Sequence, residues 1–154
     1  MDERIAVHAN QTPQLFIVKG HAGGGKSVVL RRTAWDAAHR FDRLVFRVQG
    51  GSALDRDMFE EIVSLTNQTI YLFIDDVADD AEQTLAFYNY AVRRRWPIVV
   101  IAAVRINEWN VRCEDLEPLV DEEYELRYLS DREIELLLEK LEEFNALGHL
   151  LISS

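Results

Sequence analysis

The chain has 154 residues, of which 48% are hydrophobic and 10% aromatic, and its formal net charge is −10. This length and apolar content suit one folded domain and exclude a disordered polymer. No apolar stretch approaches the roughly 20 residues that cross a bilayer, and the charged N-terminus lacks a signal core. A single cysteine, Cys113, allows no internal disulfide and fits a reducing compartment. We therefore expect a soluble, cytoplasmic domain that does not contact membranes.

The acidic charge is concentrated late in the chain. Residues 1–113 hold 14 acidic and 14 basic side chains, whereas residues 114–143 hold 13 acidic and 3 basic ones. Direct binding to nucleic acid needs clustered Lys and Arg that neutralise phosphates. The dense basic run Arg93 to Arg95 precedes Pro97, which is typical of the cationic last turn of a helix. We therefore expect no direct nucleic-acid binding.

The first motif along the chain is Gly-His-Ala-Gly-Gly-Gly-Lys-Ser at 20–27, a full match to the phosphate-binding P-loop. Glycines let the backbone N–H groups approach phosphate oxygens closely, and a following helix adds its positive end. We expect Lys26 to bridge the β- and γ-phosphates and the Ser27 hydroxyl to bind Mg²⁺. The residues expected to bind nucleotide are Gly20, His21, Ala22, Gly23, Gly24, Gly25, Lys26, Ser27 and Val28.

Apolar runs and helical spacings alternate along the chain. Strands are predicted over 15–18, 44–48, 70–74 and 98–104, with helices over 27–39, 55–65 and 81–95 between them. The strands are apolar throughout, as expected when helices cover both faces of a parallel sheet. This order predicts an α/β fold.

The late part of the chain differs from the preceding part in composition and in its predicted elements. Residues 107–119 are polar and are predicted to be irregular, and 124–128 are predicted to form a last short strand. Ser130 and Glu133 then make a capping box that opens an amphipathic, acidic helix with leucines on one face. That apolar face needs a partner.

Carboxylates follow the strand predicted over 70–74. Asp75 at its carboxyl end is expected to hold Mg²⁺ together with Ser27, and Asp76 to orient or deprotonate an attacking water. The alternative for this Asp-Asp pair is a simple turn signal. Asp79 and Asp80 are interpreted as acidic residues that favour a helix start.

A cation follows the strand predicted over 98–104. Arg105 lies at the carboxyl end of that strand, where ligands of parallel sheets bind. There it can contact the γ-phosphate, or it can be a surface arginine at the start of a loop. We name Lys26, Asp76 and Arg105 as the candidate catalytic residues.

Together, the P-loop, Phe-Ile-Asp-Asp-Val at 73–77 and Val-Ile-Ala-Ala-Val-Arg at 100–105 resemble the nucleotide-binding module of STAND ATPases, which include NACHT and plant-resistance types. The stretch 105–110 is similar to modules of bacterial anti-phage proteins. The resemblance implies a three-layer P-loop NTPase sandwich with a mostly parallel five-stranded sheet, in which the strand ending at Arg105 lies between the P-loop strand and the Asp75 strand. It also implies a switch between ADP-bound resting and ATP-bound oligomerising states.

The same resemblance divides the chain. Residues 1–128 are expected to form the P-loop core, and residues 129–154 to begin a helical lid. We expect the chain to be a fragment of a larger protein whose late helical segment mediates self-association or meets partner domains.

Three functions remain open at this point. The first is an ATP-hydrolysing regulatory switch with ATP or ADP and Mg²⁺ as cofactors. The second is a nucleotide-gated interaction module with negligible hydrolysis, and the third is a small-molecule kinase. The late segment offers such a kinase few phosphate-binding arginines, and the absence of an Asn-Lys-x-Asp signature disfavours GTP.

Overall fold

The computed structural model describes residues 13–21, 26–40, 43–49 and 54–126, and four separate helical positions, Arg132, Glu135, Leu136 and Glu139. Five strands form one sheet in the order β2-β3-β4-β1-β5, and each neighbouring pair is parallel. Its strands are β1 (Gln14–Gly20), β2 (Leu44–Gln49), β3 (Ile70–Asp75), β4 (Ile98–Arg105) and β5 (Glu122–Leu126). The predicted α/β class is confirmed, with a sheet that is parallel throughout.

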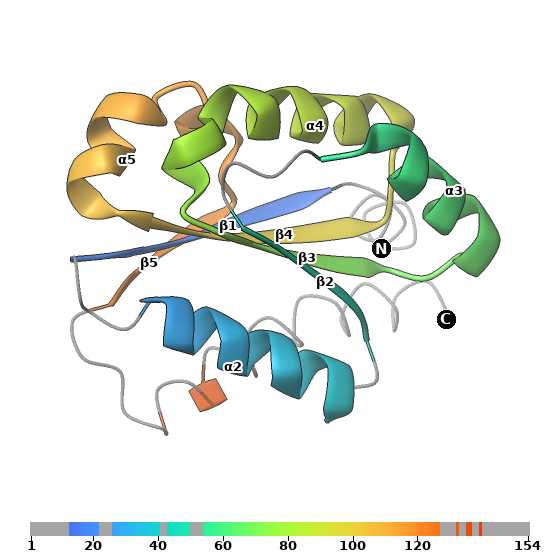
Figure 1. Ribbon diagram of the computed structural model, residues 1–154, viewed down its shortest axis with the longest axis horizontal. Coiled ribbons are helices and arrows are strands. Elements are labelled where there is room, and N and C mark those ends of the chain that lie inside the picture. Colours follow the sequence, from blue (N-terminus) through green and yellow to red (C-terminus); the bar gives the residue numbers. More distant parts are fainter. Residues whose placement is uncertain are drawn as a thin grey trace, which may run out of the picture.

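Helices cover both faces of this sheet (Figure 1). The first described helix, α2 (Lys26–His39), packs on one face. On the opposite face lie α3 (Arg56–Thr66), α4 (Ala81–Arg94) and α5 (Ile106–Arg112). Two short 3₁₀ turns, η1 (Val77–Asp80) and η2 (Glu117–Leu119), complete the described connections. None of the described helices combines the length and apolar character that a membrane crossing requires.

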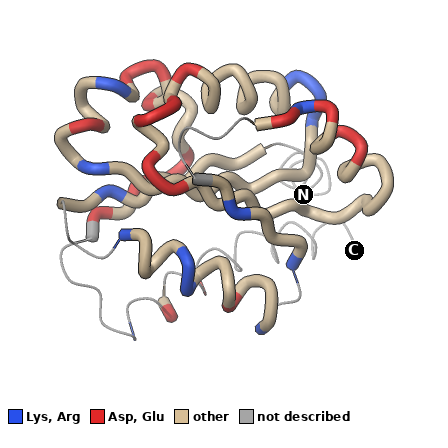
Figure 2. Tube along the Cα trace, in the orientation of Figure 1, with Lys and Arg blue, Asp and Glu red and all other residues tan. Residues whose placement is uncertain are grey.

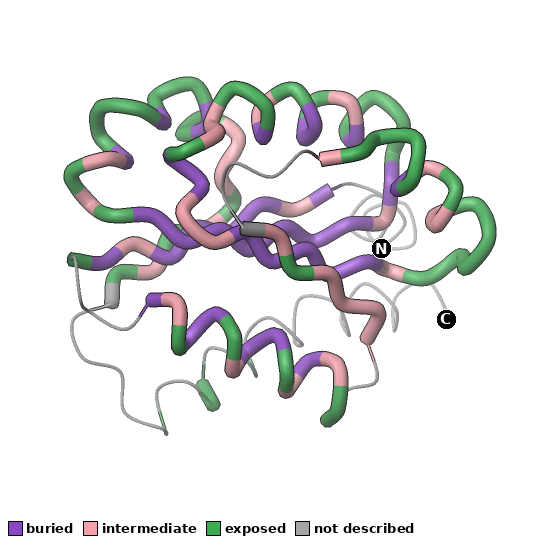
Figure 3. The backbone as a smooth tube through the Cα atoms, viewed as in Figure 1, coloured by how far each residue is buried: buried purple, intermediate pink, exposed green. Residues whose placement is uncertain are grey.

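The buried side chains form two apolar clusters, one on each face of the sheet. Leu15 and Ile17 of β1 join the cluster under α3, α4 and α5, whereas Phe16 and Val18 join the cluster under α2. Successive side chains of a strand point to opposite faces, so a strand that is buried on both sides has no polar alternation. Figure 3 shows the central strands buried along most of their length.

The ends of α3 and α4 are specified locally. The Asp55 side chain accepts a hydrogen bond from the backbone N–H of Met58 at 3.1 Å and caps the start of α3. At its other end α4 stops at Arg94, and Arg95 takes a left-handed conformation with φ of 55°. The prediction that the arginine run forms a cationic last turn is therefore confirmed.

Two predictions for the late part of the core need correction. Residues 107–119, predicted to be irregular, contain α5 and η2, because the apolar side chains of Trp109 and Cys113 are buried against the sheet. The last strand runs from Glu122 to Leu126, two residues earlier than predicted. The capping box at Ser130 and Glu133 and most of the predicted lid lie outside the described residues.

The aromatic contacts of Phe59 carry the packing of α3 on the sheet. Its ring lies 5.4 Å from that of Phe46 and 5.1 Å from that of Phe87, both edge to face, and its side chain is buried. Phe59→Ala should lower the free energy of unfolding by about 3–5 kcal/mol. Met58→Ala, at a neighbouring exposed position, is the matched control. If urea denaturation showed that Phe59→Ala and Met58→Ala lower the free energy of unfolding equally, the result would contradict this packing.

Candidate functional site

Three strand ends define the candidate site. Strands β1 and β4 pair in parallel to their last residues, with Gly20 opposite Arg105. On the other side of β4, Ile74 of β3 pairs with Ala102, and Asp75 follows directly. The three predicted positions therefore lie at the carboxyl edge of the sheet, where ligands of parallel α/β proteins bind.

Lys26 begins α2 just beyond β1. Its side chain is only 7% exposed, and its Nζ donates a hydrogen bond to the carbonyl oxygen of His21 at 3.2 Å. The ammonium group therefore folds back against its own loop. Ser27 is half-buried next to it, and Val28 faces outward. Residues 22–25, which were predicted to wrap the phosphates, lie outside the described part of the chain.

Asp75 carries an unusual oxygen. Its Oδ1 is buried and has no hydrogen-bond partner among the described residues. Buried polar atoms are nearly always paired, because losing hydration without a replacement costs free energy. A buried carboxylate oxygen at the sheet edge that also carries the P-loop strand fits Mg²⁺, which takes oxygen ligands and keeps several waters. The donor set of Asp75 and Ser27 therefore fits the implied metal.

Asp76 has a strained backbone. Its φ of 54° and ψ of 56° place it in the left-handed region, which costs a non-glycine residue roughly 1–3 kcal/mol. Its carbonyl accepts a hydrogen bond from the N–H of Asp79 at 3.1 Å, so the turn into η1 holds this conformation.

Electrostatics at Asp76 show which charges converge on this edge. Burial raises the pKa of the Asp76 carboxyl, and the negative charges of Asp75 and Asp79 raise it further, while Lys26 and Arg105 act in the opposite direction. Four charged side chains from three segments thus influence one carboxylate. Figure 2 shows the acidic connection from β3 to α4 at this edge of the sheet.

Arg105 is exposed at the end of β4, with an extended backbone that leads into α5. It belongs to the same charge cluster as Lys26 and Asp76. Asp79 was interpreted from the sequence only as an acidic residue that favours a helix start, but its charge also raises the pKa of Asp76. Its three-residue spacing from Asp76 within a turn was the signal for this proximity.

Comparison of the sequence with known protein families identifies its family. The family model described as Novel STAND NTPase 5 matches residues 2–117 of the chain. The chain belongs to this family. No curated protein matches the chain.

Solved structures show the same P-loop NTPase fold as this STAND NTPase domain. For the HORMA:CdnC:Trip13 complex of E. coli MS115-1 the TM-score is 0.57 at 12% identity, with 91% of this chain and 59% of that chain covered. For C. elegans PCH-2 it is 0.54 at 16% identity, covering 95% and 46%. For the Thermotoga maritima RuvB Holliday junction branch migration motor it is 0.55 at 14% identity, covering 91% and 48%. The chain therefore spans about half the length of these proteins.

The raised pKa of Asp76 predicts a pH-dependent effect of Asp76→Asn on stability in metal-free buffer. The folded protein holds this proton more tightly than the unfolded chain, so the wild type loses stability as the pH rises above the ordinary value of 3.8. Asp76→Asn removes that loss. Its stability relative to wild type should therefore increase as the pH rises above 3.8.

A control of opposite sign is available at Glu60. Hydrogen bonds from Tyr90 and Arg94 lower the pKa of Glu60, so Glu60→Gln should lose stability relative to wild type as the pH rises. Urea denaturation at several pH values measures both. If the stability of both variants relative to wild type changed in the same direction with pH, the assigned pKa shifts of Asp76 and Glu60 would be contradicted.

Proposed function

We propose that this STAND NTPase domain is an ATP-binding and ATP-hydrolysing regulatory switch that depends on Mg²⁺. The observation that carries the proposal is the unpartnered, buried Oδ1 of Asp75 at the sheet edge that also carries Lys26. A buried carboxylate oxygen without a partner is suited to binding a metal ion, and a P-loop lysine at the same sheet edge is suited to binding phosphate.

In this proposal Lys26 changes partner when nucleotide binds. Its Nζ leaves the His21 carbonyl, 3.2 Å away, and contacts the β- and γ-phosphate oxygens. The backbone of residues 20–25 and the first turn of α2 surround the phosphates. Mg²⁺, when bound through Ser27 and Asp75, neutralises charge on the phosphate oxygens. Adenine is favoured because the sequence has no guanine signature.

Asp76 and Arg105 are assigned the two steps that depend on the γ-phosphate. The raised pKa of Asp76 improves its carboxylate as a proton acceptor for an attacking water. Arg105 stabilises negative charge on the γ-phosphoryl group and distinguishes ATP from ADP. Since β4 leads directly from Arg105 into α5, a change at this arginine can move that helix.

One observation favours a second candidate, a nucleotide-gated module with negligible hydrolysis. The left-handed backbone of Asp76 is fixed by the turn into η1, and its side chain has one methylene less than a glutamate. The shorter side chain limits how far its carboxylate reaches toward a γ-phosphate. In that case binding of ATP or ADP alone would control self-association or contacts with partner domains.

Two substitutions separate binding from hydrolysis. Lys26→Ala should weaken Mg–ATP binding at least tenfold, because the cation that contacts the phosphates is lost. Asp76→Ala should bind Mg–ATP about as tightly as wild type and release phosphate about 10²–10⁴-fold more slowly, the usual contribution of a general base. Titration calorimetry and a phosphate-release assay measure the two effects.

The same assay decides between the candidates. Phosphate release by wild type that Asp76→Ala abolishes supports the switch ATPase. Tight ATP binding by wild type without any release supports the interaction module. Unchanged ATP affinity in Lys26→Ala would contradict both.

Arg105→Ala tests γ-phosphate sensing. Loss of a contact made only with ATP should reduce ATP affinity by about 5–150-fold and leave ADP affinity unchanged. Arg112→Ala on the exposed side of α5 is the control. Equal losses for ATP and ADP would show that Arg105 does not sense the γ-phosphate.

A further inference from the structure

The strand that leads into the P-loop has an edge strand as one of its two neighbours. Strand β5 is the last strand of the described sheet and pairs in parallel with β1 alone. Gly20, the first residue of the P-loop, lies opposite Arg105 of β4 on one side and opposite Leu126 of β5 on the other. The start of the P-loop is therefore held between a buried strand, β4, and an edge strand, β5.

The side chains of β5 do little to fix this strand by apolar packing. It contains three glutamates, a residue that is depleted in strands, and none of residues 122–125 is buried. Residues two apart point to the same face of a strand, so Glu123 and Glu125 bring two negative charges to one face. These charges repel each other unless a cation lies near them.

Lys19 of β1 supplies a cation at this position. Its Nζ lies 2.6 Å from Oε1 of Glu123, and the two side chains are 20% and 33% exposed. In the strand register Lys19 lies directly opposite Glu125. A half-buried ion pair is screened less by salt than a fully exposed one. This pair therefore joins β1 to β5 one residue before the P-loop begins.

A different contact holds the other end of the same two strands. The backbone N–H of Leu15 donates a hydrogen bond to Oδ2 of Asp121 at 2.8 Å, and the backbone N–H of Asp121 donates one to the Leu15 carbonyl at 2.8 Å. Leu15 lies at the amino end of β1, at the opposite edge of the sheet from the P-loop. Of these two contacts, only the ion pair of Lys19 adjoins the P-loop.

We infer that Lys19 is a positioning residue of the proposed nucleotide site and that it acts through its ion pair with Glu123. The pair holds the carboxyl end of β1 against β5 and thereby fixes the position of Gly20. Lys19 lies on the same face of β1 as Ile17, opposite to the face that α2 covers, so the phosphate-binding lysine remains Lys26. Displacement of a binding group by about 1 Å can reduce activity about 10²-fold, which makes such positioning consequential.

Substitution of each partner in the full chain tests this role, which rests on the proposed nucleotide binding. Lys19→Met and Glu123→Gln should each weaken Mg–ATP binding about fivefold or more, because either change removes the ion pair. Lys19→Arg keeps a cation that can pair with Glu123 and should bind Mg–ATP about as tightly as wild type. Titration calorimetry measures the affinities, and urea denaturation measures the stability of each variant.

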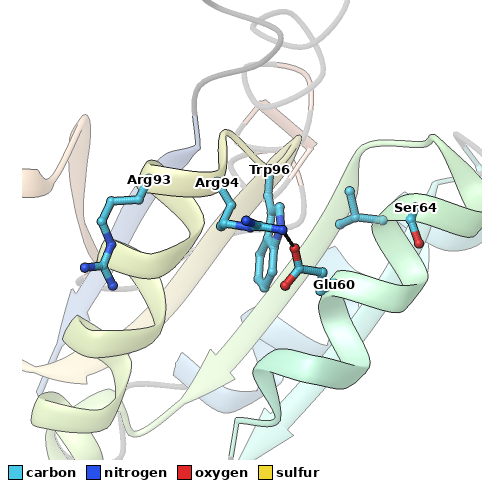
Figure 4. Close-up of a pocket in the computed structure, with 6 residues that line it drawn as sticks. Glu60, Ser64, Arg93, Arg94 and Trp96 are labelled. Atoms are coloured by element: carbon cyan, nitrogen blue, oxygen red, sulfur yellow. Dashed lines mark hydrogen bonds and ion pairs between the residues drawn. The ribbon is translucent and has the colours of Figure 1, made fainter.

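Two control variants separate positioning from a general loss of stability. Asp121→Ala removes the side-chain contact at the far end of the same strands. Arg94→Met removes the cation of another ion pair, which Arg94 forms with Glu60 between α4 and α3 (Figure 4). Both controls should lower the urea concentration at the unfolding midpoint and leave the affinity for Mg–ATP unchanged.

Three results would overturn the inference. Equal losses of affinity in Lys19→Met and Asp121→Ala would show that both act through stability alone. A loss in Lys19→Met without one in Glu123→Gln would show that the lysine acts by its charge and not through the pair. Tight Mg–ATP binding by wild type and by both pair variants would contradict the positioning role alone, whereas a wild type that binds no Mg–ATP would contradict the proposed nucleotide function as well.

Discussion

Strand β4 lies between β1 and β3 and pairs in parallel with both, and this pairing determines where the charged groups of the domain can lie. Because all three strands run the same way, whatever follows their last residues meets at one edge of the sheet. The P-loop follows β1, Asp75 ends β3 with Asp76 directly after it, and Arg105 ends β4. A sheet in which β1 and β3 were direct neighbours would leave no strand to bring Arg105 between them.

The apolar sheet is what makes this charged edge possible. Both faces of β1, β3 and β4 are buried, so the strand ends are fixed by packing rather than by the charges they carry. The domain can therefore hold an unpartnered carboxylate oxygen on Asp75 and a left-handed backbone at Asp76, features that cost free energy on their own. Such local costs are common where a ligand is to bind.

Most of the fold could be predicted from the sequence, because buried parallel strands are unbroken apolar runs and the P-loop marks the junction between β1 and α2. Two elements could not be placed correctly. Helix α5 has only seven residues and no side-chain cap, and two buried side chains, Trp109 and Cys113, anchor it within a polar stretch. Strand β5 contains three glutamates, which are depleted in strands, and pairs with β1 alone.

The positions of Asp75 and Arg105 at the carboxyl ends of neighbouring strands could be predicted from the sequence, whereas the states of the side chains at this edge could not. Nothing in the letters Asp-Asp indicates that the first carboxylate has a buried oxygen without a partner or that the second has a positive φ. The Lys26 contact with the His21 carbonyl is likewise a property of the folded loop. The ion pair between Glu60 of α3 and Arg94 of α4 could not be predicted either, because only the order of the strands brings these helices together.

We propose that these strand ends hold an adenine nucleotide with Mg²⁺. Mass spectrometry of the nucleotide released from the full-length protein, purified in Mg²⁺ buffer and then incubated with equal concentrations of ATP and GTP, tests it most directly. We expect about one ADP or ATP per chain, and none in Lys26→Ala. A bound guanine nucleotide, or no nucleotide in the wild type, would contradict it.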